Sequence, residues 1–339
     1  MDPLLIERWT GDHPALPVLD EASLSLVRGE VRAAGAAAQM DEVALGSLLV
    51  VVSELGMNQL VHGRAGVIAV VPIEREGVAG VEIVAADRGA GIADPIAAIE
   101  GTGPKKGLGV GLSGSMRLAQ EVDLDIRLGQ GLCVRARVFA GPVSRRREVV
   151  VFGRACKGER LSGDDATFVR RGGELLLGLA DGLGHGPEAL TASSLAIQAL
   201  HAHAALAPEQ ILERAALALA RTRGAVMSVA RLDEASGHLG FAGVGNVSTR
   251  RYRADGTSRS FSGPGFVLGL HQGHTPRVLG EHESLDPRDV LVMFSDGLSS
   301  RARVPDDRAL LRQHPIFLAQ RLFEHFARDN DDATVLVAG

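Results

Sequence analysis

The chain has 339 residues, 36 Lys and Arg, 41 Asp and Glu, and a formal net charge of -5. This length predicts two domains, because a domain commonly holds about 100–200 residues. The acidic balance without a basic tract argues against a nucleic-acid-binding surface, which needs clustered Lys and Arg to displace counterions.

The cysteine content and the N-terminal residues bear on where the protein works. The two cysteines, Cys133 and Cys156, match neither a disulfide framework nor a zinc motif. Residues 1–20 include acidic residues and no apolar core of signal-peptide length, and no run of 18 apolar residues occurs. We therefore expect a soluble cytoplasmic protein with no membrane or nucleic-acid partner.

The clearest change in composition is the segment PVSRRR, residues 142–147, which separates two strand-like runs. Proline and charged residues between apolar runs are typical of a connection between elements. We predict a first domain over residues 1–141, a linker over 142–147 and a second domain over 148–339.

The first domain begins with two predicted helices, over residues 20–39 and from the N-cap Asp41 onward. Two strands follow, over residues 66–73 and 80–87, and a later helix is predicted over 112–122. The second helix carries Glu54, Asn58 and His62 at a spacing of four residues, which places them on one stripe. Such a stripe is either an exposed helix face or part of a binding site.

Two glycine-rich segments follow this helix. Asp87, Gly89 and Gly91 stand at the end of the second strand, and KKGLGVGL, residues 105–112, leads into the later helix. Glycines let the backbone approach a ligand closely, and free N–H groups at a helix start favour phosphate. A single glycine-rich turn is a weak signal, because such turns often hold no ligand.

The order of these motifs is more specific than any of them alone. E-x3-N on a helix, DxGxG after a strand and GLGxGL before a helix resemble the boxes of the GHKL ATP-binding fold. That fold is shared by gyrase, large heat-shock chaperones, histidine kinases and anti-sigma-factor kinases. The likeness covers about residues 1–140 and is closest to the serine kinases RsbT and RsbW. It implies a two-layer GHKL α/β sandwich that binds ATP with Mg2+.

The resemblance also implies roles for individual residues. Asn58 would hold Mg2+, Asp87 would accept a hydrogen bond from the adenine amine, and Glu54 would be the catalytic base toward a partner's hydroxyl. The other implied nucleotide-binding residues are Gly89 and Gly91, Lys105 or Lys106 at the γ-phosphate, and Gly107, Gly109 and Gly111 around the phosphates. Members of this fold either transfer phosphate or bind nucleotide only to change shape, and both readings stay open.

The second domain alternates predicted strands and helices, which favours two sheets covered by helices on both outer faces. The expected strands end or begin at four aspartates: Asp164, Asp181, Asp296 and Asp331. Asp before Gly commonly caps a turn, but four carboxylates at strand ends are also the ligands that hard divalent cations prefer. Two cations would offset the repulsion between the carboxylates and lower the pKa of a shared water.

This ordered set resembles the PPM family of metal-dependent serine/threonine phosphatases, in the bacterial branch that contains SpoIIE, RsbU and RsbX. ADGLGHG, TRGAVMSVA, VGNVSTR, GPGFVLG, SDGL and DDATVLV carry the likeness to RsbX over most of residues 148–339. It implies a four-layer α-β-β-α PP2C-like sandwich with two Mn2+ or Mg2+ ions. The implied ligands are Asp181 between both metals with the Gly182 carbonyl, Asp164 on one metal, and Asp296 with Asp331 on the other.

Some assignments stay open at this point. Asp165 and Asp332 are adjacent alternatives to Asp164 and Asp331. The basic phosphate-binding arginine of many relatives is missing unless Arg154 or Arg160 replaces it. His185 is either a proton donor or an exposed turn residue, and Asn246 is expected to fix a turn.

Together the two resemblances imply a bifunctional partner-switching regulator. Its phosphatase would act on phosphoserine or phosphothreonine of a STAS-domain protein, in a stressosome or sigma-factor pathway. The first domain would be a serine kinase or a nucleotide-dependent regulator of the phosphatase. The alternative is a non-catalytic nucleotide switch that sequesters a partner, as an anti-sigma factor does. A homodimer is possible, and no sequence feature marks its interface.

Overall fold

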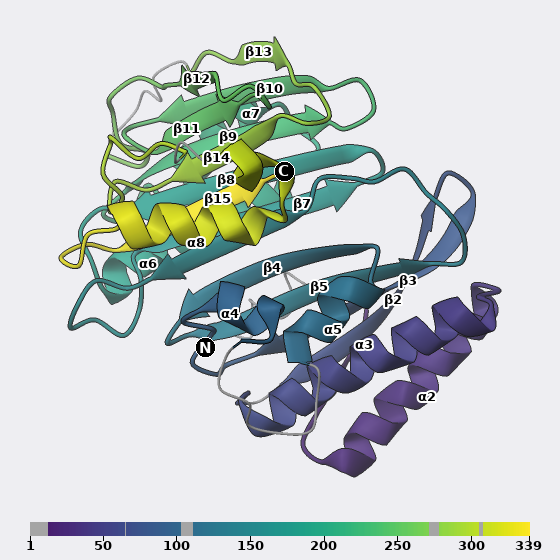
Figure 1. Cartoon of the computed structure of the whole chain (residues 1–339). Helices are drawn as coiled ribbons and strands as arrows, with labels where there is room; N and C mark the ends of the chain where they lie inside the picture. Colours follow the sequence, from purple (N-terminus) through teal and green to yellow (C-terminus); the bar gives the residue numbers. More distant parts are fainter. Residues whose placement is uncertain (1–12, 65, 103–110, 271–277, 305–307) are drawn as a thin grey trace. The chain divides into compact units, whose positions relative to one another are not determined.

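The structure is a computed structural model that describes residues 13–64, 66–102, 111–270, 278–304 and 308–339 (Figure 1). The chain divides into two compact units, Met1–Glu148 and Val149–Gly339, and each mixes helices with β-sheet. The segment expected to be a linker, residues 142–147, falls at the end of the first unit.

The first unit contains an antiparallel sheet with helices packed against it. Its strands, in spatial order, are β1 (Ala15–Pro17), β2 (Val67–Arg75), β3 (Val78–Asp87), β5 (Gly131–Phe139) and β4 (Glu121–Leu128). Its helices are α2 (Glu21–Ala37), α3 (Glu42–Val61), α4 (Pro95–Glu100) and α5 (Gly111–Leu118). Helices α2, α3 and α5 contact the sheet strands. This arrangement is compatible with the expected GHKL sandwich and does not by itself establish it.

The first two helices begin where the sequence predicts. The Asp20 carboxylate accepts a hydrogen bond from the Ser23 N–H at 2.7 Å, and the Asp41 carboxylate accepts one from the Ala44 N–H at 2.7 Å. Each contact satisfies an N–H that the first helical turn leaves free, so the start of each helix is fixed by local chemistry.

Helix α3 is unusually apolar. It has 20 residues with a mean hydropathy of 1.5 in its most apolar window, so by length and composition it could cross a membrane. Core helices of globular domains meet the same criterion, and α3 packs against α2, α5 and β3. The composition of α3 is therefore weak evidence for a membrane span.

The predicted helix over residues 112–122 is only partly right. Helix α5 ends at Leu118, and Glu121 begins β4. Strand β4 alternates acidic and apolar residues, and Arg137 on β5 pairs with Asp123 at 2.5 Å. The ion pair is buried, so pairing across the sheet outweighs the helix signal in the preceding residues.

The second unit contains two antiparallel sheets. One consists of β6 (Val149–Arg154), β15 (Ala333–Ala338), β14 (Val290–Phe294), β11 (Ser248–Tyr252) and β12 (Ser258–Phe261). The other consists of β13 (Glu281–Ser284), β10 (His238–Val244), β9 (Ala225–Asp233), β8 (Glu174–Gly182) and β7 (Asp164–Arg171). The strands predicted for this half of the chain are present.

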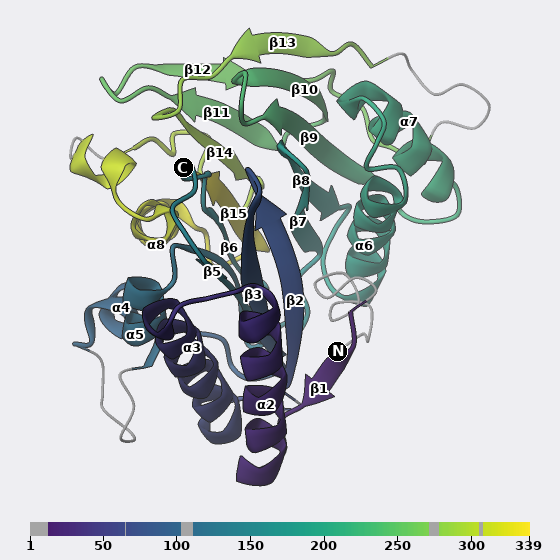
Figure 2. The same ribbon diagram turned by 90° about the vertical axis from the view of Figure 1, so that its right-hand side faces the viewer.

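Helices cover both outer faces of this pair of sheets. Helices α6 (Pro187–Ala202) and α7 (Pro208–Ala218) pack on the β10-β9-β8-β7 side, and α8 (Pro315–Phe326) packs on β6 and β15 (Figure 2). A short 3-10 helix, η1 (Arg308–Arg312), precedes α8. Strand β7 contacts both β6 and β15, which places the sheets against each other. The second unit therefore has the expected α-β-β-α layer order.

Burial of apolar side chains holds these layers together. Leu200 of α6, Ile211 of α7 and Met227 of β9 have no solvent exposure and belong to one core cluster. Burying such side chains stabilises a fold by about 1.5–3 kcal/mol each. This core fixes β8 and β9, whose ends carry the candidate site.

Candidate functional site

Two of the four predicted aspartates lie directly opposite each other. Asp164 opens β7, Asp181 stands near the end of β8, and the antiparallel register pairs the two residues. Directly opposed residues place their side chains on the same face of a sheet. Asp165 is on the other face, where its carboxylate accepts a hydrogen bond from Ser194 of α6 at 3.1 Å.

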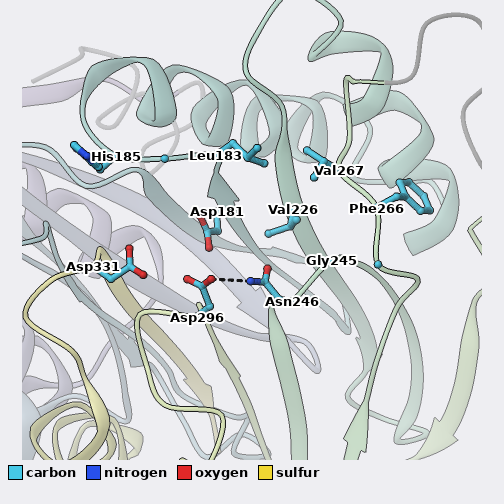
Figure 3. Close-up of a pocket in the computed structure, with 12 residues that line it drawn as sticks. Asp181, Leu183, His185, Val226, Gly245, Asn246, Phe266, Val267, Asp296 and Asp331 are labelled. Carbon is cyan, nitrogen blue, oxygen red and sulfur yellow. Dashed lines mark hydrogen bonds between the residues drawn. The ribbon is translucent and has the colours of Figure 1, made fainter.

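The other two aspartates come from the second sheet. Asp296 follows β14 and Asp331 precedes β15. These strands are antiparallel neighbours, so both residues lie at the same end of the strand pair. Asp181, Asp296 and Asp331 line one open cleft of about 600 Å³ (Figure 3). The fold thus gathers carboxylates that are up to 150 residues apart, counted from Asp181 to Asp331.

The cleft is electrostatically unfavourable without cations. Burial, together with the nearby carboxylates of Asp164, Asp296 and Asp331, raises the pKa of Asp181 to about 9. Burial raises the pKa of Asp164 to about 7, although a hydrogen bond from Ser295 opposes the shift. Positive charge in the cleft would therefore stabilise the ionised carboxylates.

A hydroxyl from the second sheet orients Asp164. The Ser295 hydroxyl donates to one Asp164 oxygen at 2.6 Å, and the Thr334 N–H donates to the Ser295 oxygen at 3.0 Å. The other oxygen, Asp164 Oδ1, is buried and has no hydrogen-bond partner. A buried carboxylate oxygen without a partner is costly, and a bound cation or water would satisfy it.

The described residues do not form a complete metal-binding site. Within them, no three His, Cys, Asp or Glu side chains stand close enough to hold a metal ion as they are placed. The oxygen-only donor set and the orphaned Asp164 oxygen fit Mn2+ or Mg2+, because both ions accept carboxylate and carbonyl oxygens.

The two adjacent aspartates before β15 have different surroundings. One Asp332 oxygen accepts the Cys156 N–H at 2.8 Å, and the other accepts the Gly163 N–H at 2.8 Å. Asp332 is 4% exposed and does not line the cleft, whereas Asp331 does. Asp332 therefore braces the backbone beside the site, and Asp331 is the better-placed candidate ligand.

Gly182, the predicted carbonyl ligand, is packed too closely for a side chain. A Cβ on Gly182 would lie 2.0 Å from the carbonyl oxygen of Ala189 in α6. Only glycine permits this approach of the β8 end to α6. The close packing sets the position of Asp181, its neighbour in the chain.

Two further polar residues line the cleft. The side-chain amide of Asn246 donates to Asp296 at 2.7 Å, as Figure 3 shows. Asn246 lies between β10 and β11, as the sequence predicts, but its contact with Asp296 is not predicted from the sequence. His185 pairs with Glu159 at 3.0 Å and is 67% exposed, so it stands at the solvent side of the cleft.

Neither arginine considered as a phosphate ligand lines the cleft. Arg154 donates to the Arg328 carbonyl at 2.8 Å and to Asp329 at 3.0 Å, so its guanidinium is engaged elsewhere. Arg160 is exposed on the surface.

Several predicted nucleotide-binding residues lie in the described part of the first unit. Glu54 and Asn58 are one turn apart on α3, and both are half-buried. Asp87 ends β3 and accepts the Gly89 N–H at 2.7 Å, and burial raises the pKa of Asp87. A Cβ on Gly89 would lie 2.7 Å from the His62 carbonyl, so this turn requires glycine.

The remaining residues of that prediction are only partly described. Gly91 has a φ of 70°, which favours glycine, and Gly111 is the first residue of α5. Four predicted phosphate-binding residues lie outside the described residues: Lys105, Lys106, Gly107 and Gly109. The nucleotide site as a whole stays a prediction.

Comparison with known proteins concerns the second unit. The family model of stage II sporulation protein E (SpoIIE) matches residues 171–339, a span that includes Asp181, Asp296 and Asp331 and begins after Asp164. No curated protein matches the chain.

The second unit is also similar to solved structures. A structure described as a bacterial stressosome, a modular system adapted to control secondary messenger signaling, is 31% identical over 57% of this chain and 100% of its own, with a TM-score of 0.53. RsbX in complex with magnesium is 23% identical over 58% of this chain and 96% of its own, with a TM-score of 0.51. The catalytic domain of the serine threonine protein phosphatase PstP, in complex with 2 manganese ions, is 20% identical over 57% of this chain and 97% of its own, with a TM-score of 0.45.

The layer order, the acidic cleft, the SpoIIE family match and the likeness to the stressosome structure indicate the same class of domain. The second unit of the chain is a SpoIIE/PP2C-type phosphatase domain. These comparisons do not show the GHKL assignment of the first unit.

Proposed function

We propose that the chain is a metal-dependent protein serine/threonine phosphatase of a bacterial partner-switching system. The observation that carries the proposal is the pairing of Asp164 with Asp181 at one edge of a cleft that Asp296 and Asp331 also approach. The match to SpoIIE and the magnesium in the RsbX structure support it.

In this proposal the cleft holds two divalent cations, Mn2+ or Mg2+. The oxygens that would bind them belong to Asp164, Asp181, Asp296 and Asp331, with the carbonyl of Gly182. The bound ions would supply positive charge against the phosphoryl group and acidify a water molecule.

The protein's own residues prepare the site for this chemistry. Ser295 fixes the orientation of Asp164, and Asn246 does the same for Asp296. Fixed ligands cost little reorganisation when charge develops in the transition state. Among the described residues that line the cleft, none is Ser, Thr, Cys or Lys, the aspartates are assigned to the cations, and His185 pairs with Glu159. Water is therefore the proposed attacking group.

The proposed substrate is phosphoserine or phosphothreonine on a STAS-domain protein. Support comes from the likeness to a stressosome structure and to RsbX, together with the open form of the cleft, which leaves room for a protein segment. The pathway would be a stress response or sigma-factor circuit in the cytoplasm.

The proposed role of the first unit is ATP binding through Asn58, Asp87 and the following glycines. Glu54 would then serve either in phosphate transfer to the same kind of partner or in a unit that only senses nucleotide. A switch that merely sequesters a partner is the second candidate. The order of the E-x3-N, DxGxG and GLGxGL motifs favours nucleotide binding in each case.

Hydrolysis of p-nitrophenyl phosphate tests the phosphatase directly. We expect turnover that requires added Mn2+ or Mg2+ and stops when EDTA is in excess. A purified, folded protein with no turnover in either metal would contradict the proposal. Measuring transfer from ATP to a candidate STAS protein, with Glu54→Ala as control, tests the kinase alternative: no transfer with Glu54 intact favours sequestration.

A further inference from the structure

We propose that Arg223 binds the phosphoryl group of the substrate at the edge of the acidic cleft. The inference rests on the proposed phosphatase activity and names a residue that the metal site does not use.

The position of Arg223 follows from one backbone contact. The Leu183 N–H donates to the Gly224 carbonyl at 3.1 Å, which holds the turn before β9 against the loop after β8. Arg223 Nη1 lies 3.1 Å from the point that a Cβ on Gly184 would occupy. Leu183 and Gly184 line the cleft; Arg223 is not itself a lining residue, and its guanidinium lies beside Gly184 at the edge of the cleft.

The backbone under Arg223 is well constrained. Gly224 has a φ of 83°, and a Cβ there would lie 2.6 Å from the Leu268 carbonyl. The Thr222 hydroxyl accepts the Gly224 N–H at 3.0 Å and donates to the Leu219 carbonyl at 2.8 Å. A fixed backbone with a long side chain places the guanidinium near the cleft while leaving it free to change partner.

The present partner of Arg223 is easily replaced. Its guanidinium pairs with Glu188 of α6, and the two side chains are 51% and 69% exposed. Exposed ion pairs contribute little stability, because water screens both charges. A phosphate monoester carries more charge than a carboxylate and accepts both arms of a guanidinium, so it competes well for Arg223.

The ionisable groups that line the cleft are mainly acidic, so a positively charged side chain at its edge would help to bind a phosphoryl group. The ionisable residues that line the cleft, in the described part of the chain, are Asp181, Asp296, Asp331 and His185. Metal ions would neutralise the aspartates, but a phosphoryl group also needs a donor on the side away from them. Arg223, beside Gly184, is placed for that contact, and Glu188 competes with the substrate for it.

Two variants with opposite expected effects test the proposal. The two quantities measured are KM for p-nitrophenyl phosphate and the Kd of inorganic phosphate, the latter by calorimetry on the Mn2+-loaded protein. We expect Arg223→Ala to raise both by about 10-fold or more, because a charge-assisted contact is lost. We expect Glu188→Gln to lower both by about 2-fold, since exposed pairs are weak and Arg223 loses its competitor. The KM and Kd of Arg223→Lys should lie between those of wild type and Arg223→Ala, because lysine keeps the positive charge but cannot donate two parallel hydrogen bonds to phosphate.

The control is Arg221→Ala, an exposed arginine on the same segment, which should leave KM and Kd unchanged. If the ion pair with Glu188 were only structural, Arg223→Ala and Glu188→Gln would change both constants in the same direction, and the proposal would be overturned. Unchanged constants in Arg223→Ala would overturn it as well. A wild type that binds phosphate through Arg223 without turnover would instead contradict the phosphatase assignment.

Discussion

Asp164 and Asp181 face each other across the β7–β8 pair, and burial raises the pKa of both carboxyls. Two opposed buried carboxylates destabilise the metal-free fold and at the same time create an electronegative site for cations. The stability of the protein and its proposed activity therefore depend on the same pair in opposite ways.

Replacing one member of the pair should separate these two effects. We expect Asp164→Asn to raise the Tm of the metal-free protein by about 2–4 °C, the shift that about 1 kcal/mol produces in a domain of this size. The amide keeps the shape and removes the repulsion. Differential scanning calorimetry in EDTA measures the change, and a lower Tm would show that the Ser295 contact outweighs the repulsion.

The raised pKa values give the metal-free protein a defined response to pH. The pKa of Asp181, raised from 3.8 to about 9, means that the folded state keeps a proton that the unfolded chain releases near pH 4. The folded state binds more protons between these values, so this group's contribution to stability falls as pH rises from about 4 to 9. Asp181→Asn lacks the titration, so its Tm in EDTA relative to wild type should increase over that range. A constant difference would refute the pKa assignment.

Metal binding should show the matching dependence. A cation displaces the protons on Asp164 and Asp181, so the apparent affinity for Mn2+ should increase with pH up to about 9. Calorimetric titrations at pH 6 and pH 8 in buffers of different ionisation enthalpy would report both the affinity and the protons released. Equal affinity with no proton release would argue against these carboxyls as ligands.

The adjacent residues Asp331 and Asp332 should respond differently to the same change. Asp332→Ala leaves the buried N–H groups of Cys156 and Gly163 without acceptors, at a cost of about 1–3 kcal/mol each. Asp331→Ala should cost less, about 1 kcal/mol, because it loses one partly buried contact, with the Asp332 N–H, and otherwise opens to the cleft, yet it should weaken Mn2+ binding. Urea unfolding and Mn2+ titration on both variants make the comparison, and reversed outcomes would exchange the two roles.

Asp87 offers a test of the first unit that is independent of the phosphatase. If it accepts a hydrogen bond from adenine, Asp87→Asn should weaken ATP binding by about 10-fold or more, since the replacement presents a donor or a weaker acceptor. Fluorescence titration with a labelled ATP analogue measures the change. Wild-type protein that binds no nucleotide would remove the ATP-binding proposal and leave the cleft of the second unit untouched.

The sequence predicts features that local chemistry controls. Asp41 caps α3 through a contact three residues away, and the buried strands of the second unit show as apolar runs bounded by turns. Each of these signals depends only on residues within a short segment of the chain. Residues 119–122 were wrongly assigned to a helix, because β4 depends on its pairing with β5, which lies beyond them.

The candidate site also has residues that the sequence predicts and contacts that it does not. Asp164, Asp181, Asp296 and Asp331 stand out from the sequence because each marks the end or start of a strand run. Nothing local separates Asp331 from Asp332, since the Asp332 partner Gly163 is 169 residues away. Asn246 and Asp296 are 50 residues apart in the sequence, so their contact likewise cannot be predicted from local sequence.

In the proposed function, the gathered aspartates bind metal for phosphoester hydrolysis. The most direct test is Mn2+-dependent phosphate release from a phosphoserine peptide by wild type and by Asp181→Asn, with circular dichroism confirming that both are folded. We predict that the variant loses at least about 100-fold in kcat/KM, because a ligand to the cations that activate water is removed. A folded Asp181→Asn variant with wild-type release would contradict the account.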